Sequence, residues 1–94
     1  MHVDHKMTRE EMQRVIEAGR TAAAVFWREG LQSLIEIWRY EGQFILTWEE
    51  APDGAQYDES GYTRDERHVF AAVEEVFAFL EQQAVDIGHF ETPE

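Results

Sequence analysis

The sequence predicts a small α+β domain in which two helices pack on an antiparallel β-hairpin, in the order helix, hairpin, helix (αββα). Three observations predict this fold. The segments that begin at Thr8 and Thr63 read T-R-E-E and T-R-D-E, the capping-box pattern that starts a helix. Between them, residues 31–51 are rich in β-branched and aromatic residues on both sides of a Glu-Gly dipeptide. The chain has 94 residues, which is enough for a single domain over residues 1–94 and too few for two.

The first helix is expected over residues 8–28, with Gly30 placed to end it. The positions of its apolar stripe follow helical spacing. They are Met12, Val15, Ile16, Gly19, Ala22, Ala23 and Phe26. A competing interpretation ends the helix near Gly19 and makes Ala22–Trp27 a strand. The long helix is favoured because alanine has the highest helix propensity and three alanines follow one another here.

The hairpin is the clearest strand signal in the chain. With a two-residue turn at Glu41-Gly42, Tyr40 pairs with Gln43 and the register follows outward from there. One face is almost continuously apolar and is expected in the core: Ile35, Ile37, Phe44, Leu46 and Trp48. The other face combines Leu34, Trp38, Tyr40 and Ile45 with Glu36, Gln43, Thr47 and Glu49. Whether the second helix covers this mixed face stays open at this point.

A long acidic loop is expected after the hairpin, over residues 49–62. It contains Pro, Asp-Gly and Ser-Gly, which interrupt regular structure, and it carries five acidic residues and no basic one. The two ends of the chain, residues 1–7 and 88–94, are expected to fray.

The second helix is expected to begin at Thr63 and to end before Gly88. Its apolar stripe consists of Val69, Ala72, Val73, Val76, Phe77, Leu80 and Ala84. The rival interpretation makes Tyr62–Phe70 a third strand that leads into a helix at Ala72. The longer helix is favoured because neither Ala71 nor Ala72 is a good N-cap residue.

The net charge of −12 lies entirely in the second half of the chain. Residues 1–40 hold six acidic and six basic residues, whereas residues 41–94 hold fourteen acidic residues against Arg64 and Arg67. This asymmetry argues against direct binding to nucleic acid or to an anionic membrane, because clustered Lys and Arg hold those polyanions. The expected partner is a basic protein. The chain has no cysteine and no long apolar segment, so we expect a cytoplasmic location.

No residue pattern commits the chain to catalysis, to a metal or to a cofactor. There is no cysteine nucleophile, and His68 lies off the apolar stripe of the second predicted helix, as a surface histidine would. The cluster His-Val-Asp-His at residues 2–5 lies in a segment that is expected to fray. Asp53, Asp58 and Glu59 lack the alternating offsets of a calcium-binding loop. We therefore predict a protein that is not an enzyme and has no metal or cofactor site.

The candidate binding surface combines aromatic residues with acidic residues that have few basic neighbours. Tyr and Trp give large, rigid contact area at interfaces, and unbalanced acidic side chains steer a basic partner into contact. The predicted partner-binding residues are Glu36, Trp38, Tyr40, Glu49, Glu50, Asp53, Tyr57, Asp58, Glu59, Tyr62, Asp65 and Glu66.

The leading hypothesis for function is an inhibitor that occupies the basic, nucleic-acid-binding surface of a partner protein. In size and charge the chain is similar to small acidic anti-defence proteins of phages, such as anti-CRISPR and anti-restriction DNA mimics, and to immunity proteins of nuclease toxins. This similarity rests on no motif and implies only nucleic-acid mimicry. The alternative is an assembly module that forms a homodimer or docks through the hairpin, with charge for solubility only. A two-stranded sheet is marginal, so an edge strand that pairs across a dimer would strengthen it.

Overall fold

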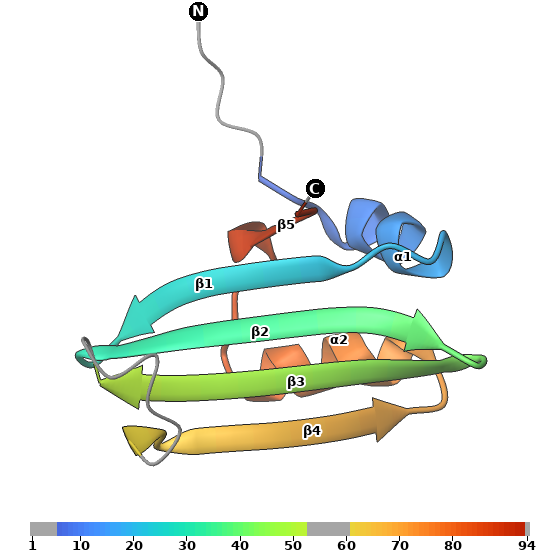
Figure 1. The fold of residues 1–94 in the computed structure, drawn as a ribbon. Coiled ribbons are helices and arrows are strands. Elements are labelled where there is room, and N and C mark those ends of the chain that lie inside the picture. The colour runs from blue at the N-terminus through green and yellow to red at the C-terminus, as the bar shows by residue number, and fades with distance from the viewer. Residues whose placement is uncertain (1–5, 53–60, 94) are drawn as a thin grey trace, which may run out of the picture.

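The computed structural model describes residues 6–52 and 61–93, which form a five-stranded antiparallel sheet and two helices (Figure 1). The elements are α1 (Arg9–Glu17), β1 (Ala22–Arg28), β2 (Leu31–Tyr40), β3 (Gln43–Pro52), β4 (Arg64–Phe70), α2 (Val73–Gln82), the 3-10 turn η2 (Ile87–His89) and β5 (Phe90–Glu91). The strand order in the sheet is β4-β3-β2-β1-β5. The predicted αββα order is therefore wrong, because seven residues of each predicted helix form a strand instead, β1 in the first and β4 in the second.

Helix α1 begins as predicted and ends eleven residues early. The Thr8 hydroxyl accepts a hydrogen bond from the Glu11 amide, and the Glu11 carboxylate accepts one from the Thr8 amide, so the capping box is present. The helix ends at Glu17 because the chain turns at Gly19, whose φ of +85° is a conformation that glycine adopts readily. Residues 22–28 then form β1, in which alternate side chains are buried, and not the second half of a helix.

The predicted helix start at Thr63 is also wrong, since this threonine supports a strand. Its amide and its hydroxyl donate to the Glu50 carbonyl oxygen at 2.7 and 3.2 Å, and β4 then pairs with β3. Helix α2 begins after Ala72, which makes no side-chain capping bond. The carboxylate of Glu75 reaches back instead and accepts a hydrogen bond from the Ala71 amide at 3.0 Å. This bond ties the residue before the N-cap to the first turn of the helix.

The predicted hairpin and its register are confirmed. Tyr40 pairs with Gln43, Trp38 with Ile45 and the remaining residues follow in the predicted order. In the turn, Glu41 and Gly42 have φ values of +52° and +78°, as a two-residue hairpin turn with two left-handed residues requires. The β1–β2 connection repeats this geometry at Glu29-Gly30, with φ values of +54° and +78°.

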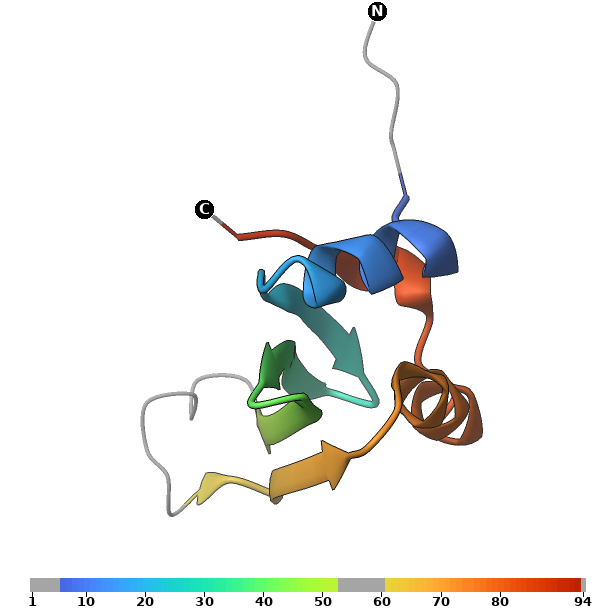
Figure 2. The same ribbon diagram turned by 90° about the vertical axis from the view of Figure 1, so that its right-hand side faces the viewer.

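Both helices lie on the same side of the sheet (Figure 2). Helix α1 packs over β1 and β2, whereas α2 packs over β3 and β4. The core lies between the helices and the sheet and includes the predicted core residues Ile35, Ile37, Phe44, Leu46 and Trp48. The helices contribute Met12, Ile16, Val73, Val76, Phe77 and Leu80 to it.

The opposite side of the sheet is covered by no element of the described part of the chain, and we call it the open face. Because side chains alternate along a strand, the register assigns to it Ala23, Val25, Trp27, Gln32, Leu34, Glu36, Trp38, Tyr40, Gln43, Ile45, Thr47, Glu49, Ala51, Asp65, Arg67 and Val69. The question that the sequence left open is answered here: α2 does not cover the face that holds Trp38 and Tyr40.

The strands that extend the predicted hairpin, β1, β4 and β5, all belong to the same chain. Strand β4 forms one edge and carries the run Arg-Asp-Glu-Arg-His at residues 64–68, which disfavours pairing with another strand. At the other edge, Ala24 of β1 pairs with Phe90 of β5, within a segment that the sequence predicts to fray. Within residues 6–52 and 61–93, neither helix is long and apolar enough to cross a membrane.

Candidate functional site

The open face exposes large apolar side chains from three strands. The exposed fractions are 49% for Val25, 61% for Trp27, 58% for Tyr40 and 53% for Val69. Leu34 and Trp38 are half-buried, and Ile45 is only 4% exposed although it lies on this side. Apolar and aromatic groups that gather on one face of a small domain are typical of an interaction site.

Acidic side chains cross the middle of this apolar face in two rows. In the first row, Val25 pairs with Leu34, Leu34 with Glu49, and Glu49 with Asp65. In the second row, Glu36 pairs with Thr47, and Thr47 pairs with Arg67. The open face therefore holds three carboxylates against one guanidinium, with exposed apolar residues on both sides of them.

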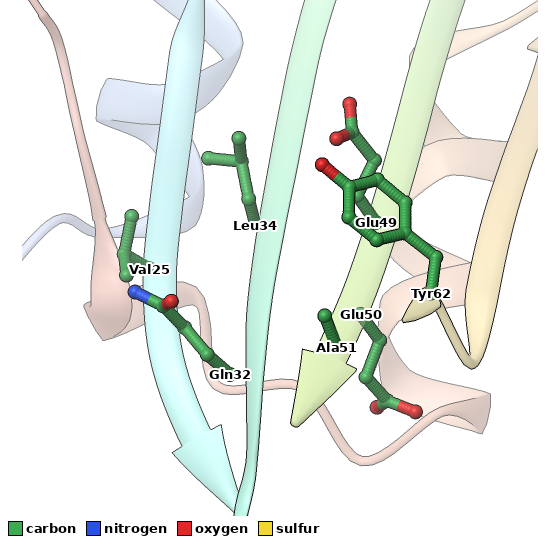
Figure 3. Close-up of a pocket in the computed structure, with 7 residues that line it drawn as sticks. All are labelled: Val25, Gln32, Leu34, Glu49, Glu50, Ala51 and Tyr62. Carbon is green, nitrogen blue, oxygen red and sulfur yellow. The ribbon is translucent and has the colours of Figure 1, made fainter. Parts of the chain in front are cut away.

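A pocket of about 340 Å³ lies at the end of the open face near the β1–β2 turn. It is lined by Val25, Gln32, Leu34, Glu49, Glu50, Ala51 and Tyr62. Figure 3 shows the ring of Tyr62 beside the carboxylate of Glu49, with Val25 and Gln32 on the opposite side of the pocket. The Oε1 atom of Gln32 is buried and has no hydrogen-bond partner among the described residues. The pocket thus joins an apolar surface to the Gln32 amide and to two glutamates, of which Glu50 is already hydrogen-bonded by Ser33 and Thr63.

The structure brings together half of the predicted partner-binding residues. Five lie on the open face, and Tyr62 lines its pocket: Glu36, Trp38, Tyr40, Glu49, Asp65 and Tyr62. Glu50 and Glu66 lie on the helix-covered side of the sheet instead. Asp53, Tyr57, Asp58 and Glu59 lie outside the described residues.

Glu50 is held in a buried hydrogen-bond network and serves the fold. Its side chain accepts hydrogen bonds from the Ser33 hydroxyl at 3.2 Å and from the Thr63 hydroxyl at 3.0 Å. Ser33 in turn accepts a bond from the indole Nε1 of Trp48 at 3.2 Å. The Arg64 guanidinium, across the strands from Glu50, lies 3.9 Å from the centre of the Trp48 ring. The network joins β2, β3 and the start of β4, and its members satisfy one another in the core.

Glu66 is likewise occupied by neighbours on its own strand. Its carboxylate lies 3.3 Å from Arg64 Nη1 and 2.8 Å from His68 Nε2. His68 packs against the ring of Phe79 of α2, with ring centroids 4.5 Å apart. His68, predicted to be a surface histidine on a helix, therefore lies on β4 and helps to attach this strand to α2.

Sequence reasoning missed residues of the open face on four strands. They include Val25 and Trp27 of β1, Gln32 of β2, Ala51 of β3, and Arg67 and Val69 of β4. The signal that could have found those of β1 is the second Glu-Gly dipeptide at residues 29–30, which repeats the turn between β2 and β3.

The described part of the chain shows no group of three His, Asp or Glu side chains that could hold a metal ion. The site is therefore best described by its shape and charge, as an apolar sheet face that is crossed by carboxylates and hollowed at one end. Comparison with protein-family models, with curated proteins and with solved structures finds no match to this chain.

Proposed function

We propose that the protein is a non-enzymatic binding protein whose open face docks on a basic surface of another protein and thereby blocks nucleic acid from that surface. The observation that carries this proposal is the open face itself, where exposed Trp27, Tyr40 and Val69 surround a group of three carboxylates. Aromatic groups supply contact area that is desolvated on binding, and the carboxylates supply orientation and a fast association rate.

The charge of the open face favours a basic partner over a second copy of this chain. Two open faces placed together would bring Glu36, Glu49 and Asp65 of one chain near those of the other, in molecules that each carry a net charge of −12. Like charges at an interface are unfavourable, whereas a partner with clustered Lys and Arg turns the same carboxylates into attractive contacts. Proteins that hold nucleic acid present such clusters, so a chain that covers one competes with the nucleic acid.

Capture from a cell lysate followed by a competition assay tests this proposal. The chain is immobilised, captured proteins are identified, and the purified partner is titrated with nucleic acid in the presence and absence of the chain. We expect the chain to displace nucleic acid and to bind its partner more weakly as NaCl rises from about 50 mM to about 500 mM, because the charges are screened. A partner that keeps its nucleic acid while it is bound to the chain would contradict inhibition.

Two matched triple variants assign the binding to the open face. Glu36→Gln, Glu49→Gln and Asp65→Asn together remove the carboxylates of this face, and we expect about tenfold weaker binding, since three exposed ion pairs of ~0.5 kcal/mol each are lost. The control removes three exposed carboxylates from the helices and has the same net charge: Glu10→Gln, Glu74→Gln and Glu81→Gln. Equal loss of affinity in both variants would show that net charge, and not the open face, determines binding.

A further inference from the structure

The pocket of the open face has two ends of different chemistry. Val25, Leu34 and Ala51 supply apolar surface. Glu49 supplies a carboxylate, and Tyr62 supplies an aromatic ring beside it (Figure 3). A ligand that fits must therefore be apolar along part of its length and positively charged where it meets Glu49.

Gln32 adds a second and independent requirement. Its Oε1 atom is buried at the wall of the pocket and accepts no hydrogen bond from the described residues. A buried acceptor without a partner favours a ligand that brings an N–H donor to it. The ligand must therefore carry several donors, because Glu49 and Gln32 stand on different strands.

We propose that this pocket receives an arginine side chain of the partner protein, an inference that rests on the proposed function above. Arginine has an apolar stem, five N–H donors, no acceptor and a flat guanidinium that stacks on aromatic rings. The stem packs on Val25 and Leu34, while the guanidinium meets the Glu49 carboxylate, the Gln32 oxygen and the Tyr62 ring. A lysine ammonium is strongly hydrated and has no flat face, so it fits the ring and the two separated acceptors less well.

The size and charge of the pocket limit the other candidates. A volume of about 340 Å³ is near the lower end of the range of about 300–1,000 Å³ for small-ligand sites, which suits one long side chain better than a helix or a strand. No basic residue lines the described pocket, so a phosphate group would meet the Glu49 carboxylate without any compensating charge.

The test compares three soluble peptides that differ only in the charged residue, which is arginine, lysine or the neutral arginine analogue citrulline. Binding to the ¹⁵N- and ¹³C-labelled chain is followed by NMR. We expect the arginine peptide to bind at least about threefold more tightly than the lysine peptide and the citrulline peptide to bind weakly, because it lacks the charge. The arginine peptide should also shift the side-chain amide signals of Gln32 and the methyl signals of Val25 and Leu34.

Two variants with the same change in charge separate the pocket from the rest of the open face. Glu49→Gln removes the carboxylate that lines the pocket, and Asp65→Asn removes its neighbour in the same row, which does not line it. We expect Glu49→Gln to abolish the preference for arginine over lysine. Asp65→Asn should weaken the binding of both peptides to the same extent and leave the preference for arginine unchanged. Circular dichroism establishes that both variants are folded.

The outcomes distinguish this inference from the proposed function. If the arginine and lysine peptides bind the open face equally and the side-chain amide signals of Gln32 do not shift, the arginine pocket is overturned. The proposal that the open face binds a basic partner is then retained. If neither peptide binds, the arginine pocket is overturned, and the competition assay with the captured partner decides the proposed function separately. If N-acetyl-arginine amide alone binds as tightly as the arginine peptide, the ligand is a small molecule and the assignment to a partner side chain is overturned.

Discussion

Leu34 and Glu49 are direct partners across β2 and β3, so the open face changes from apolar to acidic between two adjacent side chains. Val25 extends the apolar side of this boundary on β1, and Asp65 extends the acidic side on β4. A partner must match both chemistries within the spacing of two strands, about 5 Å. This requirement favours a surface in which basic side chains alternate with apolar ones.

Trp27 and Phe26 are adjacent in sequence and should respond in opposite ways to replacement by alanine. Trp27 is exposed on the open face, so Trp27→Ala should change the free energy of unfolding by less than about 0.5 kcal/mol while it weakens partner binding. Phe26 is buried and lies edge-on to Trp48, so Phe26→Ala should destabilise the fold by about 3–5 kcal/mol. Urea denaturation measures both effects. Similar destabilisation by the two substitutions would contradict the assignment of the faces.

Ser33 is the central member of the buried network, so its hydroxyl should contribute more to stability than that of a threonine on the open face. Ser33→Ala removes the acceptor of the Trp48 indole and one donor to Glu50, and we expect a loss of about 1–3 kcal/mol. Thr47→Ala on the open face is the control and should cost less than about 1 kcal/mol. If the two variants are equally stable by urea denaturation, the network does not stabilise the fold as described.

Two substitutions in the turn between β2 and β3 should change the stability of the protein in opposite directions. Gly42 has a φ of +78°, so Gly42→Ala should destabilise the protein by about 1–2 kcal/mol. Glu41 has a φ of +52°, a conformation that asparagine adopts more readily than glutamate, so Glu41→Asn should stabilise it by about 0.5 kcal/mol. Thermal denaturation of the wild type and the two variants measures both changes in stability. A stabilising Gly42→Ala would mean that this turn has another geometry.

The stability of the protein should rise with ionic strength. A net charge of −12 on 94 residues repels itself, and salt screens that repulsion. Between about 20 mM and about 1 M NaCl we expect the free energy of unfolding to increase by roughly 1 kcal/mol. The triple variant Glu36→Gln, Glu49→Gln and Asp65→Asn should gain less, since it carries less charge. A fall in stability with added NaCl would mean that attractive ion pairs outweigh the repulsion.

The central hairpin could be predicted residue by residue because its signals are local. The dipeptide Glu41-Gly42 fixes the turn, and the alternation of apolar residues on both sides then fixes which side chains share a face. For this reason Glu36, Trp38, Tyr40 and Glu49 were correctly grouped on one side of the sheet. The same dipeptide at residues 29–30 carried the same information about β1, but the helix propensity of three alanines outweighed it.

At residues 62–70 the strand was only the less favoured of two interpretations, because tertiary contacts and not the local pattern decide this segment. The segments at Thr8 and Thr63 have nearly the same capping-box sequence, yet the first caps a helix and the second hydrogen-bonds Glu50. What distinguishes them is the free edge of β3, which pairs with residues 64–70 and offers them a complete ladder of backbone hydrogen bonds. Arg67 and Val69 of β4 join the open face only through this pairing and were therefore missed.

The two Glu-Gly turns also bear on the order in which the molecule forms. They join β1, β2 and β3 with only two residues each, so these strands pair segments that are close in sequence and lose little chain entropy on closing. Hairpins of this kind form within about 1–10 μs, whereas β4 must close a longer connection before α2 can dock. Trp27, Leu34 and Glu49 all belong to the three-stranded unit. We therefore expect these three side chains to come together early in folding, before β4 and α2 are added.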